Sequence, residues 1–566
     1  MRGLDATRSP AASGSPPDGA VHVARMASHM SALEVPVSVI NATTHESLAA
    51  ARERAVTWRS ETANLTLDTI TADGVLDDLA AAAKSAGDAR FGRIIDAIAI
   101  THTGKPKPIP NLGAAPAVLS TFLRRDMIDG WLYITKDDGH LHPHLVTSIG
   151  VDSSNDGRMF LSIRVTADNL AVRRGERGET GHQTLTLSAQ EIVKKQPADV
   201  LLALGAYKET PALKADYLAR RAQFEKMASE GFAEQFRFTG TAFATDNYRS
   251  RTKTRTNRRV VHDIAPAELR PFAEYAPSAL FVDADGTDGA GPVPVLTVLR
   301  VFDLSSHDTI TVNSADLTEY VYDKTLRDKL ILPDDQRELL DILTTDIGTF
   351  TGDIVEGKTA GNVILGKGIP GVGKTLTAEV YSELIERPLY SIHSGALGVQ
   401  ADDVRKNLEE VFARAKRWNA VLLLDEADVF VLERGHNLQQ NAIVAEFLRT
   451  MEYFDGLLFM TTNRANNIDD AILSRCAAII DYQVPDAADA RRVWQVLAAN
   501  HGTVIPDTIL DELVDGYAHI TPRDIKMLLR LALRVAAHRG TGLTADVFRQ
   551  CGIFRGLHWT PNGAAA

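Results

Sequence analysis

Eight residues near the middle of the chain constrain its fold more than any other stretch. Residues 368–375 read GIPGVGKT, follow the apolar, β-branched run at 362–365 and precede residues that suit a helix. Glycine tolerates backbone conformations that other residues resist, so the three glycines of this stretch allow successive N–H groups to point inward. Together with the positive N-terminus of a helix, such N–H groups bind phosphate oxygens. The strand–loop–helix context therefore predicts a phosphate-binding loop.

The side chains that end this loop suit a nucleotide with a metal ion. Lys374 is expected to neutralise the β- and γ-phosphates, and the Thr375 hydroxyl is expected to bind Mg²⁺. The alternative is a glycine-rich turn that precedes Lys-Thr by chance. The predicted nucleotide-binding residues are Gly368, Ile369, Pro370, Gly371, Val372, Gly373, Lys374, Thr375 and Leu376.

The size and charge of the chain set outer limits on what it can be. At 566 residues it is too long for one hydrophobic core, so several domains are expected. A net charge of −12 argues against a general nucleic-acid coat and leaves only local basic patches as candidates. The two cysteines, Cys476 and Cys551, are too few for a disulfide framework, which indicates a reducing compartment.

No stretch of the sequence predicts a membrane segment. An apolar run of about 18 residues would be needed to span a bilayer, and none is present. The N-terminus also lacks the short apolar core of a secretory signal. We therefore expect a cytoplasmic protein that does not contact a membrane.

Apolar runs and helical patterns alternate after the loop. This alternation predicts a five-stranded parallel sheet covered by helices on both faces. In such a sheet, ligands gather at the carboxyl ends of the strands. The further strands are expected at 389–392, 421–424, 457–460 and 477–480, and helices at 403–418 and 441–453.

Two of these strands end in residues suited to phosphate chemistry. The run 421–424 leads directly into Asp425, predicted to hold the metal, and Glu426, predicted to be the catalytic base. An acidic helix cap after a strand is the alternative. The run 457–460 leads toward Asn463, whose amide could hold both the γ-phosphate and the attacking water, although by itself this would be an ordinary strand exit.

These motifs resemble those of a known family. GIPGVGKT, LLLDEAD and FMTTNR, in this order, resemble Walker A, Walker B and sensor 1 of the AAA+ (AAA-family) ATPases, and the resemblance extends from about residue 330 onward. In IDDAILSRC it implies that Arg475 is the arginine finger, with Arg464 in reserve. The Ser-Arg-Cys form is closest to clamp loaders, since the usual AAA pattern continues with Gly-Arg.

The resemblance also implies a lid and an assembly. Arg523 matches sensor 2, at the start of a helix in a small helical lid; the alternative is an arginine in the first turn of a packing helix. The implied cofactors are ATP and Mg²⁺, and the implied assembly is a homo-oligomeric ring, a hexamer. Threading members carry an aromatic residue in the loop after the second strand, where this chain has only Leu397 as a weak substitute.

The rest of the chain is expected to form a mixed α+β region of unsettled role. We predict a disordered leader at 1–32, an N-terminal recognition region of one or two domains at 33–320, the ATPase domain at 321–487, the helical lid at 488–553 and a tail at 554–566. Within the N-terminal region we expect helices at 45–58, 74–86, 94–100, 189–206 and 213–231, an antiparallel meander at 131–135, 144–151 and 159–165, and short strands across 236–312, followed by a helix from 333–335.

Two side-chain patterns in this region invite a functional interpretation. His140, His142 and His144 alternate along a strand and so share one face, which makes a metal site geometrically possible. We interpret them as an exposed strand start, because no cysteine or acidic cluster has matching spacing.

The second pattern is a run of basic residues with period two. Alternating cations on one strand face suit a phosphate-rich or acidic partner, but cations on an edge strand also prevent aggregation, and both interpretations stay open. The residues are Arg249, Arg251, Lys253 and Arg255, followed by Arg258 and Arg259.

The sequence thus predicts an Mg²⁺-dependent ATP hydrolase that acts as an oligomer. Our first hypothesis is a motor that remodels a protein client recruited by the N-terminal region. The alternative is a nucleic-acid-associated loader or switch that uses the basic strand at 249–259. A nucleotide-gated scaffold without turnover is disfavoured because Glu426 is intact.

Overall fold

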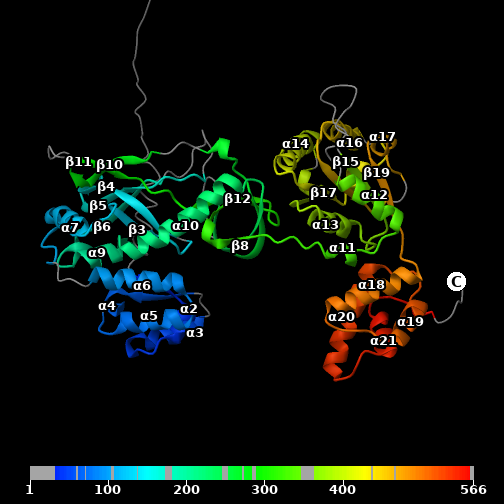
Figure 1. Cartoon of the computed structure of the whole chain (residues 1–566), viewed down its shortest axis with the longest axis horizontal. Coiled ribbons are helices and arrows are strands. Elements are labelled where there is room, and N and C mark those ends of the chain that lie inside the picture. Colours follow the sequence, from blue (N-terminus) through cyan, green and yellow to red (C-terminus); the bar gives the residue numbers. More distant parts are fainter. Residues whose placement is uncertain are drawn as a thin grey trace, which may run out of the picture.

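The fold was analysed in a computed structural model of the chain (Figure 1). The predicted leader falls almost entirely outside the described residues, and the predicted tail is described as far as Thr560. The structure describes residues 32–58, 62–70, 72–102, 107–136, 138–171, 181–244, 253–269, 273–282, 288–345, 362–398, 400–434, 438–464 and 467–560.

A five-stranded antiparallel sheet forms the centre of the N-terminal region. Its strands lie in the order β6-β5-β4-β3-β7, and β3, β4 and β5 form the predicted meander. Trp131 and Tyr133 of β3 face one apolar core, while Leu132 and Ile134 face another, as the alternation of side chains along a strand requires. The bounds are β3 (Trp131–Thr135), β4 (Leu141–Ser153), β5 (Met159–Thr166), β6 (Gln183–Ser188) and β7 (Ala206–Lys208).

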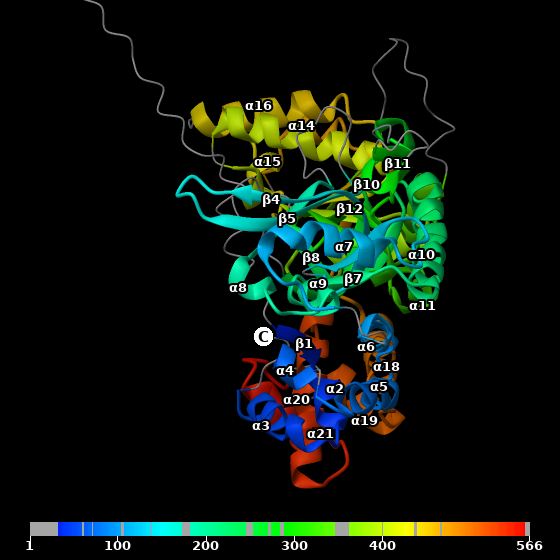
Figure 2. The same ribbon diagram turned by 90° about the vertical axis from the view of Figure 1, so that its left-hand side faces the viewer.

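Helices cover both faces of this sheet (Figures 1 and 2). One core contains α2 (Val37–Ala42), α3 (Ala49–Trp58), α5 (Val75–Ser85) and α6 (Ala89–His102), with the antiparallel pair of β1 (Ala32–Pro36) and β2 (Thr62–Thr66) and the short α4 (Leu67–Ile70). The other contains α7 (Ala115–Arg124), α8 (Ala189–Ile192) and α9 (Pro197–Ala203). The hairpin of β10 (Tyr275–Val282) and β11 (Asp288–Pro292) lies against β4.

The single helix predicted over 189–206 is wrong. The structure has α8, a break at 193–196, α9 and then the strand β7. Lys194 takes a left-handed backbone conformation with φ of 65°, and its N–H donates to the carbonyl of Ile109. Pro197 then begins a new helix, where its missing N–H is not needed.

A small closed β-barrel follows the sheet. The strand β8 pairs with β9 on one side and with both β13 and β14 on the other, so the sheet closes on itself. Its interior holds Phe238, Val301 and Ile310, and the last turns of α10 (Pro211–Glu230) add Phe224 to the same cluster. The strands are β8 (Gln235–Ala244), β9 (Lys253–His262), β12 (Val298–Asp303), β13 (Asp308–Asn313) and β14 (Leu317–Glu319).

The parallel sheet predicted for the ATPase region is confirmed. Its order is β16-β17-β18-β15-β19, with every neighbouring pair parallel. The strands are β15 (Asn362–Gly368), β16 (Leu389–His393), β17 (Val421–Asp425), β18 (Leu457–Thr462) and β19 (Ala478–Tyr482). One face packs on α14 (Ala401–Arg417), α15 (Asp428–Val431), α16 (Leu438–Met451) and α17 (Asp470–Leu473), and the other on α11 (Leu326–Lys329), α12 (Asp334–Thr345) and α13 (Lys374–Leu384).

Four helices follow the parallel sheet and share a core of their own. Trp494 and Phe548 lie at its centre, with their rings 5.4 Å apart. Leu330 and Leu332 pack in the core of the parallel sheet, whereas Ile331 between them packs against the helical core. The helices are α18 (Ala487–Asn500), α19 (Asp507–Gly516), α20 (Pro522–Arg539) and α21 (Ala545–Ile553).

The barrel packs against the amino-terminal edge of the parallel sheet. Trp418, just before β17, packs with Phe302 of the barrel and Tyr390 of β16 in one aromatic cluster, with ring centroids 5.0 and 5.5 Å from the indole and 5.6 Å from each other. The indole Nε1–H donates to Asp263 Oδ1 at 2.9 Å, and the Arg414 guanidinium lies 4.6 Å over the Phe302 ring. This aromatic joint therefore joins the N-terminal region to the end of the sheet opposite the carboxyl ends of its strands.

Candidate active site

The predicted phosphate loop joins β15 to α13. Gly368 and Gly371 both have positive φ, 146° and 92°. A Cβ at Gly368 would lie 2.4 Å from the carbonyl oxygen of Tyr482, and a Cβ at Gly371 would lie 2.7 Å from Cβ of Arg523. Both positions therefore require glycine, because the loop passes close to the neighbouring strand and to helix α20.

Lys374 occupies the centre of this loop. Its Nζ donates to the carbonyls of Gly368 and Ile369, each at 2.8 Å, and to Asn463 Oδ1 at 2.9 Å. Burial lowers the pKa of the ammonium, while the carboxylates of Asp425 and Asp428 oppose that shift. The ammonium thus links the loop to the end of β18.

Asp425 ends β17 beside the first turn of α13. Its Oδ1 accepts hydrogen bonds from the hydroxyls of Thr375, at 2.9 Å, and Thr461, at 2.5 Å. The predicted metal residues Thr375 and Asp425 therefore lie together. They meet because β17 and β15 are parallel strands separated by β18, and all three present their carboxyl ends at one edge.

Glu426, the predicted base, follows in a strained backbone conformation. Its φ is 53°, which is uncommon for a residue other than glycine. Its N–H donates to Thr461 Oγ1 at 3.0 Å, and its side chain is exposed. The exposed carboxylate is thus presented at the same edge of the sheet as Asp425.

Asn463 is held at the end of β18 by a third acid. The carboxylate of Asp428 accepts the N–H of Asn463 at 3.1 Å and the hydroxyl of Thr462 at 2.5 Å. The Asn463 side chain is then free to accept from Lys374. The structure thus joins the predicted loop lysine to the sensor amide by a hydrogen bond, while the neighbouring Thr375 binds the predicted metal acid Asp425.

The two predicted arginines lie in different surroundings. The N–H of Arg523, in the first turn of α20, donates to the carbonyl of Gly371 at 3.1 Å, so this helix begins against the predicted phosphate loop. Arg475, after α17, donates to the carbonyl of Ala471 at 3.0 Å and pairs with Glu452 at 3.4 Å. Its side chain is about one-third exposed, at 35%.

Comparison with known families decides what this site belongs to. Residues 364–484 match the ATPase family associated with various cellular activities (AAA). The chain contains an AAA ATPase domain. The match begins within β15 and ends just after β19, so it spans almost the whole parallel sheet. The predicted family is confirmed for this domain, and an AAA ATPase domain indicates nucleotide binding and ATP hydrolase activity.

Curated proteins resemble part of the chain. A proposed 26S proteasome regulatory subunit homolog from Methanothermobacter thermautotrophicus is 26% identical over 195 residues, which is 33% of this chain and 51% of that protein. A mitochondrial sorting homolog from Caenorhabditis elegans is 28% identical over 184 residues, 31% of this chain and 53% of its own length. An ATP-dependent zinc metalloprotease FtsH from Caldicellulosiruptor bescii is 33% identical over 196 residues, 31% of each chain. The chain therefore spans about half or less of the length of these relatives.

The loop after β16 does not offer a substrate grip at Leu397. The notion that this side chain substitutes for an aromatic one is wrong, because Leu397 is 1% exposed and packs in the core of the sheet. Its carbonyl accepts from Asn407 of α14 at 3.1 Å, which ties the turn to that helix. Of the neighbouring residues, Val399 lies outside the described part of the chain.

The histidine strand is buried, so its interpretation as an exposed strand start is wrong. His140 pairs with Asp316, and His142 pairs with Asp138, each at 2.8 Å. The strand β4 lies between β3 and β5, and this position buries its first half. Among the described residues, no group of three or more His, Cys, Asp and Glu side chains could hold a metal ion.

The described arginines of the basic strand are paired within the chain. Arg255 binds the buried Asp303, Arg258 lies 3.7 Å from the same carboxylate, and Arg259 lies 3.6 Å from Glu383 of α13. Arg249 and Arg251 lie outside the described residues, and β9 begins at Lys253. Of these three arginines, Arg255 has a side chain that is only 9% exposed, while Arg258 and Arg259 keep 40% and 42% of their side chains exposed.

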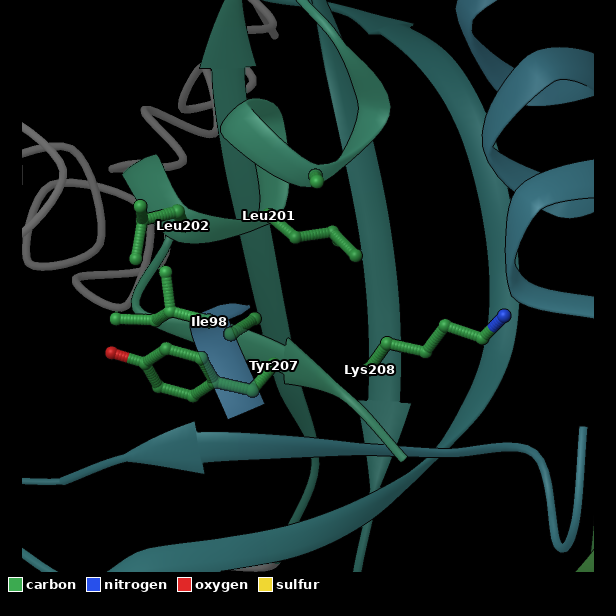
Figure 3. A pocket seen from close by; sticks show the side chains of 7 residues that line it. Ile98, Leu201, Leu202, Tyr207 and Lys208 are labelled. Atoms are coloured by element: carbon green, nitrogen blue, oxygen red, sulfur yellow. The ribbon is translucent and has the colours of Figure 1, made fainter. Parts of the chain in front are cut away.

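A small recess between α6, α9 and β7 does not resemble a ligand site (Figure 3). Ile98, Leu201 and Leu202 give it an apolar lining, and the Lys208 ammonium points away from them. That ammonium donates to the carbonyl of Phe122 at 2.9 Å and to that of Arg125.

Among the described helices, none is long and apolar enough to cross a membrane.

Sequence reasoning missed the contributions of Thr461, Thr462 and Asp428. The pattern at 461–463 by itself predicts only an ordinary strand exit, and it predicts no role for Asp428. One strand ends in two hydroxyl side chains, and the strand beside it ends in acids. This combination could have indicated the contacts. The signal becomes specific only when the two strands are known to be neighbours.

Proposed function

We propose that the protein hydrolyses ATP with Mg²⁺ as an oligomer and uses the energy to remodel a protein client recruited by its N-terminal region. The observation that carries the hydrolysis is a group of two hydrogen-bonded pairs, Lys374 with Asn463 and Thr375 with Asp425, at the carboxyl edge of the parallel sheet. Phosphoryl transfer needs positioning and charge neutralisation more than covalent chemistry, and this group provides both.

The donor set beside the loop fits Mg²⁺. Thr375 Oγ1 and Asp425 Oδ1 lie 2.9 Å apart, and both are the hard oxygen ligands that Mg²⁺ prefers. One carboxylate suffices, because Mg²⁺ usually keeps several waters and binds substrate phosphates. Thr375 and Asp425 would hold the ion, which supplies charge neutralisation at the phosphates.

The remaining residues have distinct roles in the proposed reaction. The loop N–H groups and Lys374 hold and neutralise the phosphates, while Asn463 orients the attacking water. Glu426 accepts a proton from that water. Arg523 reaches the γ-phosphate from the lid, and residues 368–376 form the nucleotide cradle.

The assembly follows from the arginine proposed as a finger. Arg475 contacts Ala471 and Glu452 of its own chain and is partly exposed, so it is available to a neighbouring subunit. We propose that it acts in trans in a hexameric ring. We also propose the division into a recognition region at 33–320, an ATPase domain at 321–487 and a lid at 488–553.

Steady-state hydrolysis tests the chemical part of this proposal. The wild type should hydrolyse ATP with Mg²⁺ and lose turnover in EDTA, and the rate per subunit should rise with protein concentration. Glu426→Gln should bind ATP and fail to hydrolyse it, because the base is lost while the loop is intact. Full turnover by Glu426→Gln would reject Glu426 as the base.

The client part needs a separate measurement. The ATPase rate should rise when an unfolded protein such as reduced casein is added, and should not respond to single- or double-stranded nucleic acid. Stimulation by nucleic acid alone, in a salt-dependent manner, would reject the protein client and favour the loader.

A further inference from the structure

The hydroxyl of Thr461 joins the two acids of the site. Thr461 is the penultimate residue of β18 and is 4% exposed. Its Oγ1–H donates to Asp425 Oδ1 at 2.5 Å, and the same oxygen accepts the N–H of Glu426 at 3.0 Å. One hydroxyl thus contacts the proposed metal acid and the backbone of the proposed base.

The backbone of Thr461 adds a third contact. Its carbonyl accepts the N–H of Ala427 at 2.8 Å, so two consecutive N–H groups after β17 bind this one residue. The pairing of Leu424 with Met460 places Asp425 beside Thr461, which explains why all three contacts form. The turn after β17 is therefore attached to β18 through Thr461.

This attachment matters because the turn is strained at Glu426. A φ of 53° is disfavoured for glutamate and persists only where the surrounding contacts hold it. The hydrogen bond to Thr461 Oγ1 is such a contact. Without it, the Glu426 N–H would lose its partner, and the backbone could relax and turn the carboxylate in another direction.

We propose that Thr461 is a positioning residue for hydrolysis: its hydroxyl fixes the direction of the Glu426 carboxylate and the orientation of the Asp425 carboxylate. This inference rests on the proposed ATP hydrolysis. The inference goes beyond ATP hydrolysis because it assigns part of the positioning of the base to a residue outside the acidic motif.

The test replaces the hydroxyl while keeping the shape. Thr461→Val keeps the branched side chain and removes the hydroxyl, whereas Thr461→Ser keeps the hydroxyl. Thr344→Val is the matched control, because Thr344 is also buried, at 3% exposed, and donates to a carbonyl within α12. Each purified full-length variant is measured for kcat, for binding of a fluorescent ATP analogue and for melting temperature.

We expect Thr461→Val to lower kcat by about 10- to 100-fold, the scale of a small misplacement of a reacting group. Nucleotide affinity should change by less than about threefold, because the loop and Lys374 are untouched. Thr461→Ser should recover most of kcat, and Thr344→Val should leave it unchanged.

Other outcomes would overturn the inference. Wild-type kcat in a folded Thr461→Val protein would show that the hydroxyl does not position the base. A loss in Thr461→Ser equal to that in Thr461→Val would assign the effect to shape. Parallel losses of kcat, affinity and melting temperature would indicate a merely structural role. If the wild type itself does not hydrolyse ATP, the proposed function fails first.

Discussion

Truncation of Trp418 should detach the barrel from the ATPase domain. Trp418 is 1% exposed and contacts Phe302 and Tyr390, while its indole N–H binds Asp263. Truncating a buried tryptophan to alanine costs about 3–5 kcal/mol. This range includes the cost of losing the hydrogen bond from the indole N–H. The loss leaves Asp263 Oδ1 without that donor.

Two further variants separate these contributions. Trp418→Phe keeps an aromatic ring and loses the hydrogen bond, so we expect a loss of about 1–2 kcal/mol. Trp494→Ala is the matched control: it removes from the proposed helical lid a fully buried tryptophan whose ring meets that of Phe548 edge to face. It should destabilise the lid by a similar amount and leave the barrel unaffected.

Hydrogen exchange read by mass spectrometry distinguishes the joint from general instability. In Trp418→Ala, amides near 260–263 and 300–304 should exchange faster, because these segments form the barrel side of the joint. Nucleotide affinity should stay within about threefold, since Trp418 lies before the start of β17 and Asp425 at its end, and the strand alone spans about 13 Å at 3.3 Å per residue.

The aromatic joint would be refuted as a stabilising contact by two results together. These are unchanged exchange of the barrel amides in Trp418→Ala and a loss of unfolding free energy below about 0.5 kcal/mol, the scale of ordinary surface substitutions. Faster barrel exchange in Trp494→Ala would show that the barrel responds to any loss of stability.

Three further predictions concern the site, the assembly and pH. Lys374→Ala should weaken ATP binding by about 10- to 100-fold, because it removes a charge-assisted contact worth about 1.5–3 kcal/mol; unchanged affinity by titration calorimetry would contradict its role. Arg475→Ala should lower turnover by about 1,000-fold or more with binding intact, and mixing it with Glu426→Gln should restore activity at interfaces that pair an intact Glu426 with an intact Arg475; no recovery in mixtures that co-assemble would argue against action in trans. Burial lowers the pKa of His262 from 6.5 to about 4. Because the unfolded chain then binds the proton more tightly, stability is fully present above pH 6.5 and is lost as the pH falls toward 4, by up to about 3 kcal/mol. Denaturant midpoints from pH 7.5 to 4.5 should show this slope, and an equally steep slope in His262→Asn would assign it to other groups.

The sequence alone was sufficient for the elements whose signal is local. The glycine spacing at 368–375 and the apolar run before it predict a phosphate loop, because a loop of this kind is defined by neighbours in the chain. The same holds for the acids Asp425 and Glu426 after a strand, and for the helices and strands of the parallel sheet. The match to AAA ATPases over 364–484 agrees with these predictions.

Local pattern failed where partners come from far along the chain. The histidines of β4 follow a turn and look exposed, yet the strands on either side bury them. The cations of β9 look like a free surface, but Asp303 and Glu383 lie beside them in the folded chain. The helix expected over 189–206 is interrupted where Lys194 bonds to Ile109, a contact no local pattern contains.

The tertiary structure alone decided how the site is held in place. Thr461 binds the turn of Asp425 and Glu426 only because β17 and β18 are parallel neighbours in one register, and a shift by one residue would turn the hydroxyl to the other face. Closure of the barrel likewise depends on the pairing of β8 with β13, which are far apart in sequence. The contact of the barrel with Trp418 depends on Phe302, which lies more than 100 residues earlier in the chain. Residue spacing determines which groups can occur together on one element, while strand register and packing determine which groups from different elements meet.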